Sequence, residues 1–324
     1  MMEEFNYLQK EVNAKLATFT SSIENSELKQ TVEYSILGGK RLRPILIYSL
    51  CKLIGCSNLY INNSVIMVEL LHSGSLILDD MPSMDNDNYR RGLESVHKKF
   101  GIKRAYITVN YMFMKAIYLL LDLIKQLKNN NEKTIILKLI NIVFMSNNLT
   151  SLGQMVDLTK SFDVSKMSYV VSIFKNNSHI NNFFNNYKSE IHDSLSFNTK
   201  LDNLLLLNLK TFPLFYLSFQ LPLLYKTNKL MKYYTIDRVI YISFIFSLLF
   251  QIADDFEDYI SDQKLDSTNS FIKLLGKKDT YGLYKLSIDE FNKEIKDLKI
   301  PVLSTIVYLL NKKINKYINQ EWIQ

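Results

Sequence analysis

The chain has 324 residues, of which 47% are hydrophobic, and it carries a formal net charge of +7. This apolar fraction is ample for a core and excludes wholesale disorder. The low counts of glycine (9) and proline (5) favour long helices over a turn-rich β fold. The positive charge favours polyanionic partners, but the lysines are scattered and form no nucleic-acid-binding motif. We therefore expect a solvated basic surface and no nucleic-acid partner.

The first predicted helices lead to an acidic cluster. Residues Glu24 to Leu37 have helical propensity, and Gly38-Gly39 ends this stretch as a glycine C-cap would. The next helix covers Ile45 to Ile54 and has a proline in its first turn. A third, apolar helix starts at the N-cap candidate Asn63 and reaches the acidic residues that begin at Asp79.

The rest of the chain has helical patterns throughout, apart from one polar segment. Residues at about 175–198 are rich in asparagine, and we interpret them as an inserted loop or a loosely ordered helix pair without chemistry of its own. The lysines after residue 290 are interpreted as solvated surface. We predict a single all-α domain over residues 1–324, with further helices near 105–128, 132–144, 148–159, 230–261, 280–297 and 302–319.

Three features bear on where the protein works. Cys51 and Cys56 match neither a metal-ligand spacing nor a disulfide framework, so we expect reduced thiols and a cytoplasmic protein. The first residues are acidic at once, unlike a signal peptide. The apolar run from Asn203 to Tyr225 contains a lysine and two prolines, and the run from Val239 to Ala253 is too short to span a bilayer. We expect buried helices there and no transmembrane segment.

Two aspartate-rich clusters are the most informative pattern in the chain. The first acidic cluster runs from Asp79 to Asp85, and because Pro82 is tolerated only near a helix end, Asp85 should lie on the turn that follows. The second acidic cluster, Asp254 to Asp258, places two aspartates at i and i+4 on one helix face. Crowded carboxylates repel one another unless a cation lies between them, and Mg²⁺ binds such oxygens together with substrate phosphates. One such motif is more often a solvated helix end, but two favour a site that binds a diphosphate through metal ions.

Cationic residues accompany these clusters. The segment Gly38 to Arg43, which we call the basic loop, carries Lys40, Arg41 and Arg43 beside a helix start. Guanidinium groups and a helix N-terminus can bind a second diphosphate there. Arg90-Arg91 follows the first acidic cluster and offers two more guanidinium groups. Taken alone, each group of cations is equally well explained as charge balance for the aspartates.

Together these segments resemble the trans-prenyl diphosphate synthases, the family that makes farnesyl and geranylgeranyl diphosphates. The resemblance implies an isoprenoid synthase fold, a single large helical bundle around a central active-site cavity, and a homodimer. It rests on segments that follow the family's order over most of the chain: Leu37 to Pro44, His72, Asp79 to Gly92, Ser95 to Gly101, Gly153 to Leu158, Lys210-Thr211 and Phe250 to Asp258.

The resemblance also implies a reaction. An allylic diphosphate (dimethylallyl, geranyl or farnesyl) ionises, the double bond of isopentenyl diphosphate attacks the allylic cation, and a proton is lost to the departing diphosphate. Farnesyl or geranylgeranyl diphosphate results. The implied cofactor is Mg²⁺, with three ions per active site.

The resemblance assigns roles to individual residues. The metal ligands would be Asp79, Asp80, Asp85, Asp254 and Asp258. The allylic diphosphate would be held by Arg90, Lys210 and Lys278, and isopentenyl diphosphate by Lys40, Arg43, His72 and Arg91. Thr211 and Gln251 would line the reacting centre, and the residues most directly tied to catalysis would be Asp79, Asp80, Asp85, Asp254 and Lys210.

Product length depends on the residues before the first acidic cluster. In the family they form the floor of the pocket for the growing chain, and a bulky aromatic there stops growth at fifteen carbons. Gly74 and Ser75 are small, which favours twenty carbons, but Tyr111, Met112 and Phe113 on the next helix would close the same space. Both products stay open at this point.

Two other functions are compatible with such a chain. A terpene cyclase of the same fold has no isopentenyl diphosphate to bind, and the basic loop argues against it. A non-catalytic or weakly active partner subunit of a prenyl synthase usually lacks aspartates from one cluster, and both clusters are intact here. The segment Val109-Asn110-Tyr111, where the family has a Gly-Asp-Ala-like sequence, keeps the partner-subunit alternative open.

Overall fold

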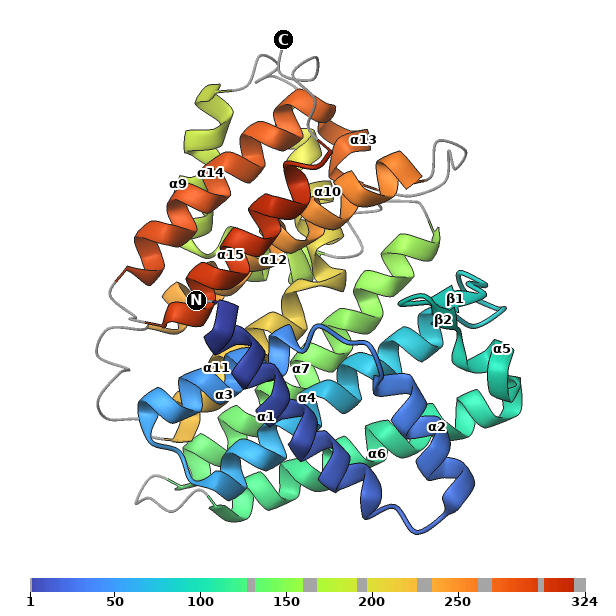
Figure 1. Cartoon of the computed structure of the whole chain (residues 1–324). Coiled ribbons are helices and arrows are strands. Elements are labelled where there is room, and N and C mark those ends of the chain that lie inside the picture. The colour runs from blue at the N-terminus through green and yellow to red at the C-terminus, as the bar shows by residue number, and fades with distance from the viewer. Residues whose placement is uncertain are drawn as a thin grey trace. The chain divides into compact units, whose positions relative to one another are not determined.

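The computed structural model describes residues 2–126, 132–159, 168–190, 197–225, 235–261, 270–296 and 300–317. These residues form helices almost throughout (Figure 1). A short antiparallel hairpin pairs β1 (Tyr89–Arg90) with β2 (Leu93–Glu94). The predicted all-α fold is confirmed.

The described residues divide into two compact units. The first lies within residues 1–143 and 217–227, and the second within residues 144–216 and 228–324. Two helices, α7 (Glu132–Thr159) and α11 (Phe212–Tyr225), contribute residues to both units. The single domain over residues 1–324 stays a prediction.

The first unit is built around one buried helix, α4. Its sequence is apolar on nearly every side, which suits a helix surrounded by others, and it packs against α1, α2, α3 and α6. The hydroxyl of Tyr60 on α4 donates to the carbonyl oxygen of Leu221 on α11 at 2.7 Å. Besides α4 (Asn58–Asp79), this unit contains α1 (Met2–Ser21), α2 (Ser26–Ile36), α3 (Leu42–Ile54), α5 (Val96–Phe100) and α6 (Ile102–Gln126).

The ends of these helices follow local capping chemistry. The Asn25 side chain accepts a hydrogen bond from the backbone N–H of Leu28 at the start of α2. Gly55 ends α3 in the left-handed conformation, with φ of 75°. The N-cap of α4 is Ser57, whose hydroxyl accepts from the N–H of Tyr60 at 3.1 Å. The predicted cap at Asn63 is therefore wrong, since Asn63 lies inside the helix and is buried.

The second unit is arranged around α12, which packs against α9, α13, α14 and α15. Aromatic side chains fill its core, and the ring of Phe174 lies 5.0 Å from that of Phe212 and 5.2 Å from that of Phe244, centroid to centroid. Its described helices are α8 (Ser168–Lys175), α9 (Ser178–Glu190), α10 (Phe197–Leu207), the 3₁₀ turn η2 (Asn208–Lys210), α12 (Ile236–Ser261), α13 (Phe271–Leu275), α14 (Lys277–Ile295) and α15 (Pro301–Ile314).

Two predicted segments differ in detail. The helices expected at 132–144 and 148–159 form one continuous helix, α7. Much of the asparagine-rich segment is α9, which begins after Asn177; the side chain of Asn177 accepts from the N–H of Ile180 and donates to the carbonyl oxygen of Asp237. Residues 191–196 lie outside the described part, and an insertion at 175–198 stays a prediction.

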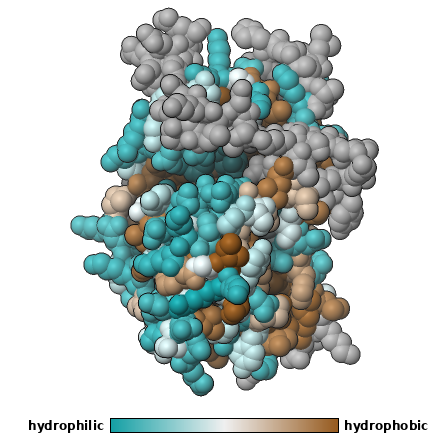
Figure 2. Space-filling view, turned by 90° about the vertical axis from the view of Figure 1, so that its right-hand side faces the viewer, coloured by the Kyte–Doolittle hydropathy of each residue, from teal (hydrophilic) through white to brown (hydrophobic). Residues whose placement is uncertain are grey.

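Four helices of the described part are long and apolar enough to cross a membrane, judged by length and composition alone. Burial explains the apolar character of α4 and α12, because 72% and 67% of the residues in their most apolar 18-residue stretches are buried in the protein. The corresponding shares are 39% for α6 and 33% for the apolar part of α7. Figure 2 shows one face of the molecule, where hydrophilic side chains are spread widely with hydrophobic ones between them. The absence of a transmembrane segment remains a prediction.

Candidate active site

The first acidic cluster lies where α4 ends. Asp79 and Asp80 are 8% and 3% exposed. The backbone N–H of Asp85 donates to the carbonyl oxygen of Asp79 at 3.0 Å, so the turn after the helix brings Asp85 back to the helix end. The sequence predicts this turn correctly, because a helix does not continue through Pro82.

Arg90 on β1 compensates the charge of this cluster. Its Nε donates to Oδ1 of Asp80 at 2.8 Å, and a second guanidinium nitrogen contacts the same oxygen. That second nitrogen also contacts Asp87 at 3.1 Å. Burial raises the pKa of Asp80 above its ordinary value, and the hydrogen bonds and positive charge of Arg90 offset only part of this. Arg90 is therefore held at the acidic cluster, as charge balance for the aspartates would require, and its binding of the allylic diphosphate remains a prediction.

In the second acidic cluster, some carboxylates face solvent and one is buried. Asp254, Glu257 and Asp258 on α12 are exposed, whereas Asp255 is 6% exposed. Asp255 accepts hydrogen bonds from Nε2 of Gln251 at 3.0 Å and from the N–H of Phe271 at 2.7 Å. Burial raises the pKa of Asp255 to about 7, although these hydrogen bonds lower it in part. Asp255 thus fixes the start of α13, and the other three acids of the cluster face solvent.

Lys313 on α15 lies against the second acidic cluster. Its Nζ is 2.5 Å from Oδ1 of Asp254 and 2.5 Å from Oε2 of Glu257, and its side chain is 14% exposed. Burial lowers the pKa of Lys313, but the two carboxylates outweigh it and the pKa lies above its ordinary value. The interpretation of all lysines after residue 290 as solvated surface is therefore wrong for Lys313. The local sequence does not indicate this contact, because Lys313 lies 59 residues from Asp254 in the chain.

These carboxylates suit the predicted Mg²⁺ in their chemistry. Within the residues that the structure describes, no group of three or more His, Cys, Asp or Glu side chains converges on one metal position. Mg²⁺ does not require such a group, since it normally takes one or two carboxylates and fills its remaining positions with phosphate oxygens and water. The ammonium of Lys313 between two carboxylates shows that the second acidic cluster accepts a cation. The five predicted metal ligands remain predictions.

A close backbone contact positions Lys210 and Thr211. A Cβ on Gly153 of α7 would lie 2.5 Å from the backbone nitrogen of Lys210, so only glycine allows η2 to approach α7 this closely. The hydroxyl of Thr211 donates to Oε1 of Gln251 at 2.6 Å, and the Gln251 amide donates onward to Asp255. Thr211 and Gln251 are thus in contact, in keeping with the prediction that they line one centre. Lys278 is exposed in the first turn of α14.

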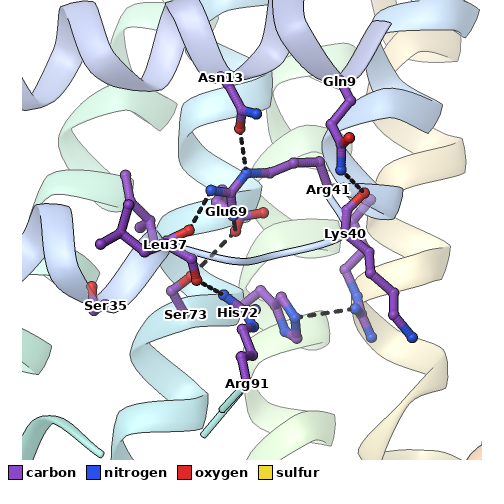
Figure 3. Close-up of polar contacts among 12 residues, drawn as sticks. Gln9, Asn13, Ser35, Leu37, Lys40, Arg41, Glu69, His72, Ser73 and Arg91 are labelled. Carbon is purple, nitrogen blue, oxygen red and sulfur yellow. Dashed lines mark hydrogen bonds and ion pairs between the residues drawn. The ribbon is translucent and has the colours of Figure 1, made fainter. Parts of the chain in front are cut away.

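The basic loop turns sharply so that Arg41 points into the protein (Figure 3). Gly38 and Arg41 both have positive φ, 69° and 60°. A Cβ on Gly39 would lie 2.2 Å from a guanidinium nitrogen of Arg41, so a larger residue there would displace the Arg41 side chain. Arg41 is 7% exposed and forms a buried ion pair with Glu69 at 2.6 Å. Of the three cations that the sequence places on this turn, Arg41 is buried, Lys40 is exposed and Arg43 is half-buried.

His72 joins Arg43 and Arg91 at this loop. Its Nε2 is 3.4 Å from a guanidinium nitrogen of Arg43, and a guanidinium nitrogen of Arg91 donates to the carbonyl oxygen of Leu37 at 3.1 Å. Burial and then the nearby arginines lower the pKa of His72 well below its ordinary value, so the imidazole is neutral. Because arginine only donates, Nε2 of His72 is the acceptor and Nδ1 carries the proton. Four residues predicted to hold isopentenyl diphosphate therefore lie around one loop.

The predicted site residues fall into both units. The basic loop, His72, Arg91 and the first acidic cluster belong to the first, and Lys210, Thr211, Gln251, Lys278 and the second acidic cluster belong to the second. Sequence reasoning missed Glu69, which holds Arg41. The only sign of this role in the sequence is that Glu69 is a carboxylate in an otherwise apolar helix, where burial of an unpaired charge would cost free energy.

Comparison with known proteins identifies the family. Residues 25–269 match the family described as Polyprenyl synthetase, which is more than half of the chain. The chain belongs to the polyprenyl synthetase family. Members of this family typically use Mg²⁺, and the homologues are named farnesyl and geranylgeranyl diphosphate synthases.

Individual relatives agree with this assignment over part of their length. The chain is 37% identical to the farnesyl diphosphate synthase of Escherichia coli, over 35% of this chain and 39% of that protein. It is 32% identical to the geranylgeranyl diphosphate synthase of Saccharolobus solfataricus, over 52% of this chain and 50% of that protein. The matched regions thus span half or less of these curated relatives.

Solved structures agree over nearly the whole chain. A geranyltransferase from Legionella pneumophila covers 97% of each chain with a TM-score of 0.71 and 20% identity. An FPP/GFPP synthase from Zymomonas mobilis covers 91% of this chain and 94% of its own, with a TM-score of 0.68 and 22% identity. At this identity the likeness shows the fold, and the isoprenoid synthase fold predicted from the sequence is confirmed.

Proposed function

We propose that the protein is a short-chain trans-prenyltransferase that condenses isopentenyl diphosphate with an allylic diphosphate. The observation that carries this proposal is the set of cations around the basic loop. Arg43 and Arg91 lie near a neutral His72, Lys40 is an exposed residue of the same loop, and the buried Glu69 is paired with Arg41. Such an excess of positive charge suits a diphosphate. An enzyme that only ionises an allylic substrate has no use for this second site, which favours condensation over terpene cyclisation.

The other predicted residues supply the allylic half of the reaction. Arg90, Lys210 and Lys278 bind the allylic diphosphate and stabilise its charge as the C–O bond breaks. Asp79, Asp80, Asp85, Asp254 and Asp258 would hold Mg²⁺, which when bound withdraws electron density from the leaving diphosphate. Thr211 and Gln251 line the reacting centre, where the hydrogen bond between them fixes the amide of Gln251. An apolar site would keep water from the allylic cation.

The product we propose is farnesyl diphosphate. A Cβ on Gly74 would lie 2.7 Å from Cε1 of Phe113, so the Phe113 ring on α6 fills the space beside this glycine. Gly74 lies on α4, five residues before Asp79. The closing aromatic group therefore comes from α6, although the α4 residues themselves are small. This favours growth to fifteen carbons over growth to twenty.

We further propose that the protein works as a cytoplasmic homodimer. An exposed apolar stripe runs along α6 at helical spacing, formed by Ile107, Met114, Tyr118 and Leu121, which are 64%, 53%, 53% and 51% exposed. Such a stripe suits a second copy of the chain better than water. Both cysteines are free, in keeping with a reducing compartment.

The test is an incubation of the purified protein with Mg²⁺, isopentenyl diphosphate and dimethylallyl, geranyl or farnesyl diphosphate in turn, with products identified by mass. We expect a fifteen-carbon product that Asp79→Ala and Asp254→Ala abolish, and a longer product from Phe113→Ala. Folded protein that forms no product with any primer would instead support the partner-subunit function.

A further inference from the structure

Arg41 occupies an unexpected place in the basic loop. It lies between Lys40 and Arg43, the two cations of the loop that we propose bind the diphosphate, yet its own guanidinium is buried. Its Nε donates to Oδ1 of Asn13 at 2.8 Å, and a second nitrogen donates to Oε1 of Glu69 at 2.6 Å. The third nitrogen contacts the carbonyl oxygen of Ile36. Arg41 is therefore bound on three sides by protein atoms, which suits a structural clamp and not a ligand contact.

The clamp fixes an unfavourable backbone conformation. Arg41 has φ of 60°, a left-handed conformation that side chains other than glycine seldom adopt and that persists only where the surroundings hold it. Because Arg41 lies next to Lys40 and two residues before Arg43, its backbone angles set the directions in which these two side chains leave the loop. A displacement of about 1 Å in the position of such a charged group is enough to weaken catalysis substantially.

One side of the clamp comes from α1. Besides Asn13, the side-chain amide of Gln9 on this helix donates to the carbonyl oxygen of Lys40 at 3.4 Å (Figure 3). Helix α1 spans Met2–Ser21, whereas the family match begins at residue 25. The part of the loop that leads to Lys40 is thus held by a helix that the family match does not include.

We propose that Arg41 is a positioning residue, oriented by Glu69 and by Asn13, and that α1 thereby sets the affinity of the basic loop for isopentenyl diphosphate. This inference rests on the proposed function. It names Asn13 as a residue that acts on substrate binding through Arg41 without touching the substrate. Asn13 is an exposed residue, so its replacement leaves the core intact.

The test compares three variants on α1. Asn13→Ala removes the acceptor for Arg41, and we expect the KM for isopentenyl diphosphate to rise about 5- to 10-fold, the scale of one lost hydrogen bond of ordinary strength. The KM for the allylic substrate and the thermal midpoint should stay at wild-type values. Asn13→Asp keeps an acceptor oxygen and should restore the KM. The control is Thr18→Ala, since Thr18 is exposed and its hydroxyl bonds to the Ala14 carbonyl of the same helix.

Titration calorimetry with isopentenyl diphosphate alone separates this inference from the proposed function. If the wild-type protein binds the compound and Asn13→Ala binds it about 5-fold more weakly, the positioning role is supported. Equal binding by both proteins overturns the positioning role and leaves the proposed function standing. An equal rise in both KM values shows a general structural role and also overturns it. Wild-type protein that neither binds the compound nor forms product refutes the proposed function itself.

Discussion

The basic loop and the second acidic cluster hold their charged side chains by different means. At the basic loop the orienting ion pair, Arg41 with Glu69, is buried, with exposures of 7% and 1%. At the second acidic cluster the ion pairs join Lys313, whose side chain is 14% exposed, to Asp254 and Glu257, whose side chains are 52% and 48% exposed. A buried pair fixes geometry because breaking it is costly, whereas a pair with solvent-exposed acids is screened by water and salt and contributes less. The basic loop is therefore expected to be rigid, and the second acidic cluster is expected to exchange the ammonium of Lys313 for another cation.

The largest effect is expected when the buried pair is broken. Glu69→Ala leaves Arg41 buried without its carboxylate, and we expect the free energy of unfolding to fall by about 3 kcal/mol. Urea denaturation followed by circular dichroism measures this change. Glu69→Gln keeps an acceptor oxygen and should lose less. A loss below about 1 kcal/mol in Glu69→Ala would show that the pair is no more important than an exposed one.

A smaller effect is expected at the glycine beside Lys210. Gly153→Ala places a methyl group 2.5 Å from the backbone nitrogen of Lys210 and forces α7 and η2 apart. We expect a destabilisation of about 1–3 kcal/mol, the range for overpacking, together with a rise in the KM for the allylic substrate. Gly282→Ala is the matched control, since an added Cβ there meets no atom within 4 Å. Similar results for both variants would refute the close-contact explanation.

The basic loop should also respond to pH through His72. Its pKa is lowered on folding, so the stability that depends on its neutral form is present above the unfolded pKa, about 6.5, and is lost as the pH falls below that value. We expect the free energy of unfolding to fall by up to about 1.4 kcal/mol per pH unit below pH 6.5. His72→Gln should make this dependence shallower. Identical pH profiles for the two proteins would rule out a contribution from His72.

The smallest effect is expected at the partly exposed ion pairs of Lys313. Lys313→Met removes the ammonium beside Asp254 and Glu257, and we expect a stability change of less than about 1 kcal/mol. Because the pKa of Lys313 is raised on folding, its stabilising contribution is present below the unfolded pKa, about 10.4, and is lost as the pH rises through the folded value. Thermal melts between pH 7 and 11 measure it. A loss as large as that of Glu69→Ala would remove the distinction between the two regions.

The sequence predicts the helices and most site residues because these depend on local patterns. Glycine and proline mark the turn at the basic loop, and Pro82 predicts the position of Asp85. The features that the sequence does not predict depend on contacts between segments far apart in the chain. The inward turn of Arg41 requires Glu69, 28 residues away, and the burial of Lys313 requires Asp254. The start of α4 at Asn58 was missed because Asn63 is also a good capping residue, and only the tertiary environment buries it.

The central claim is that the basic loop binds isopentenyl diphosphate and not the allylic substrate. Steady-state kinetics of Arg43→Met, with each substrate varied in turn, test this most directly. We predict a KM for isopentenyl diphosphate raised at least about 10-fold, since a charged hydrogen-bonding group is lost, and a KM for the allylic diphosphate that is unchanged. A variant with the KM for the allylic diphosphate raised and that for isopentenyl diphosphate unchanged would contradict the account.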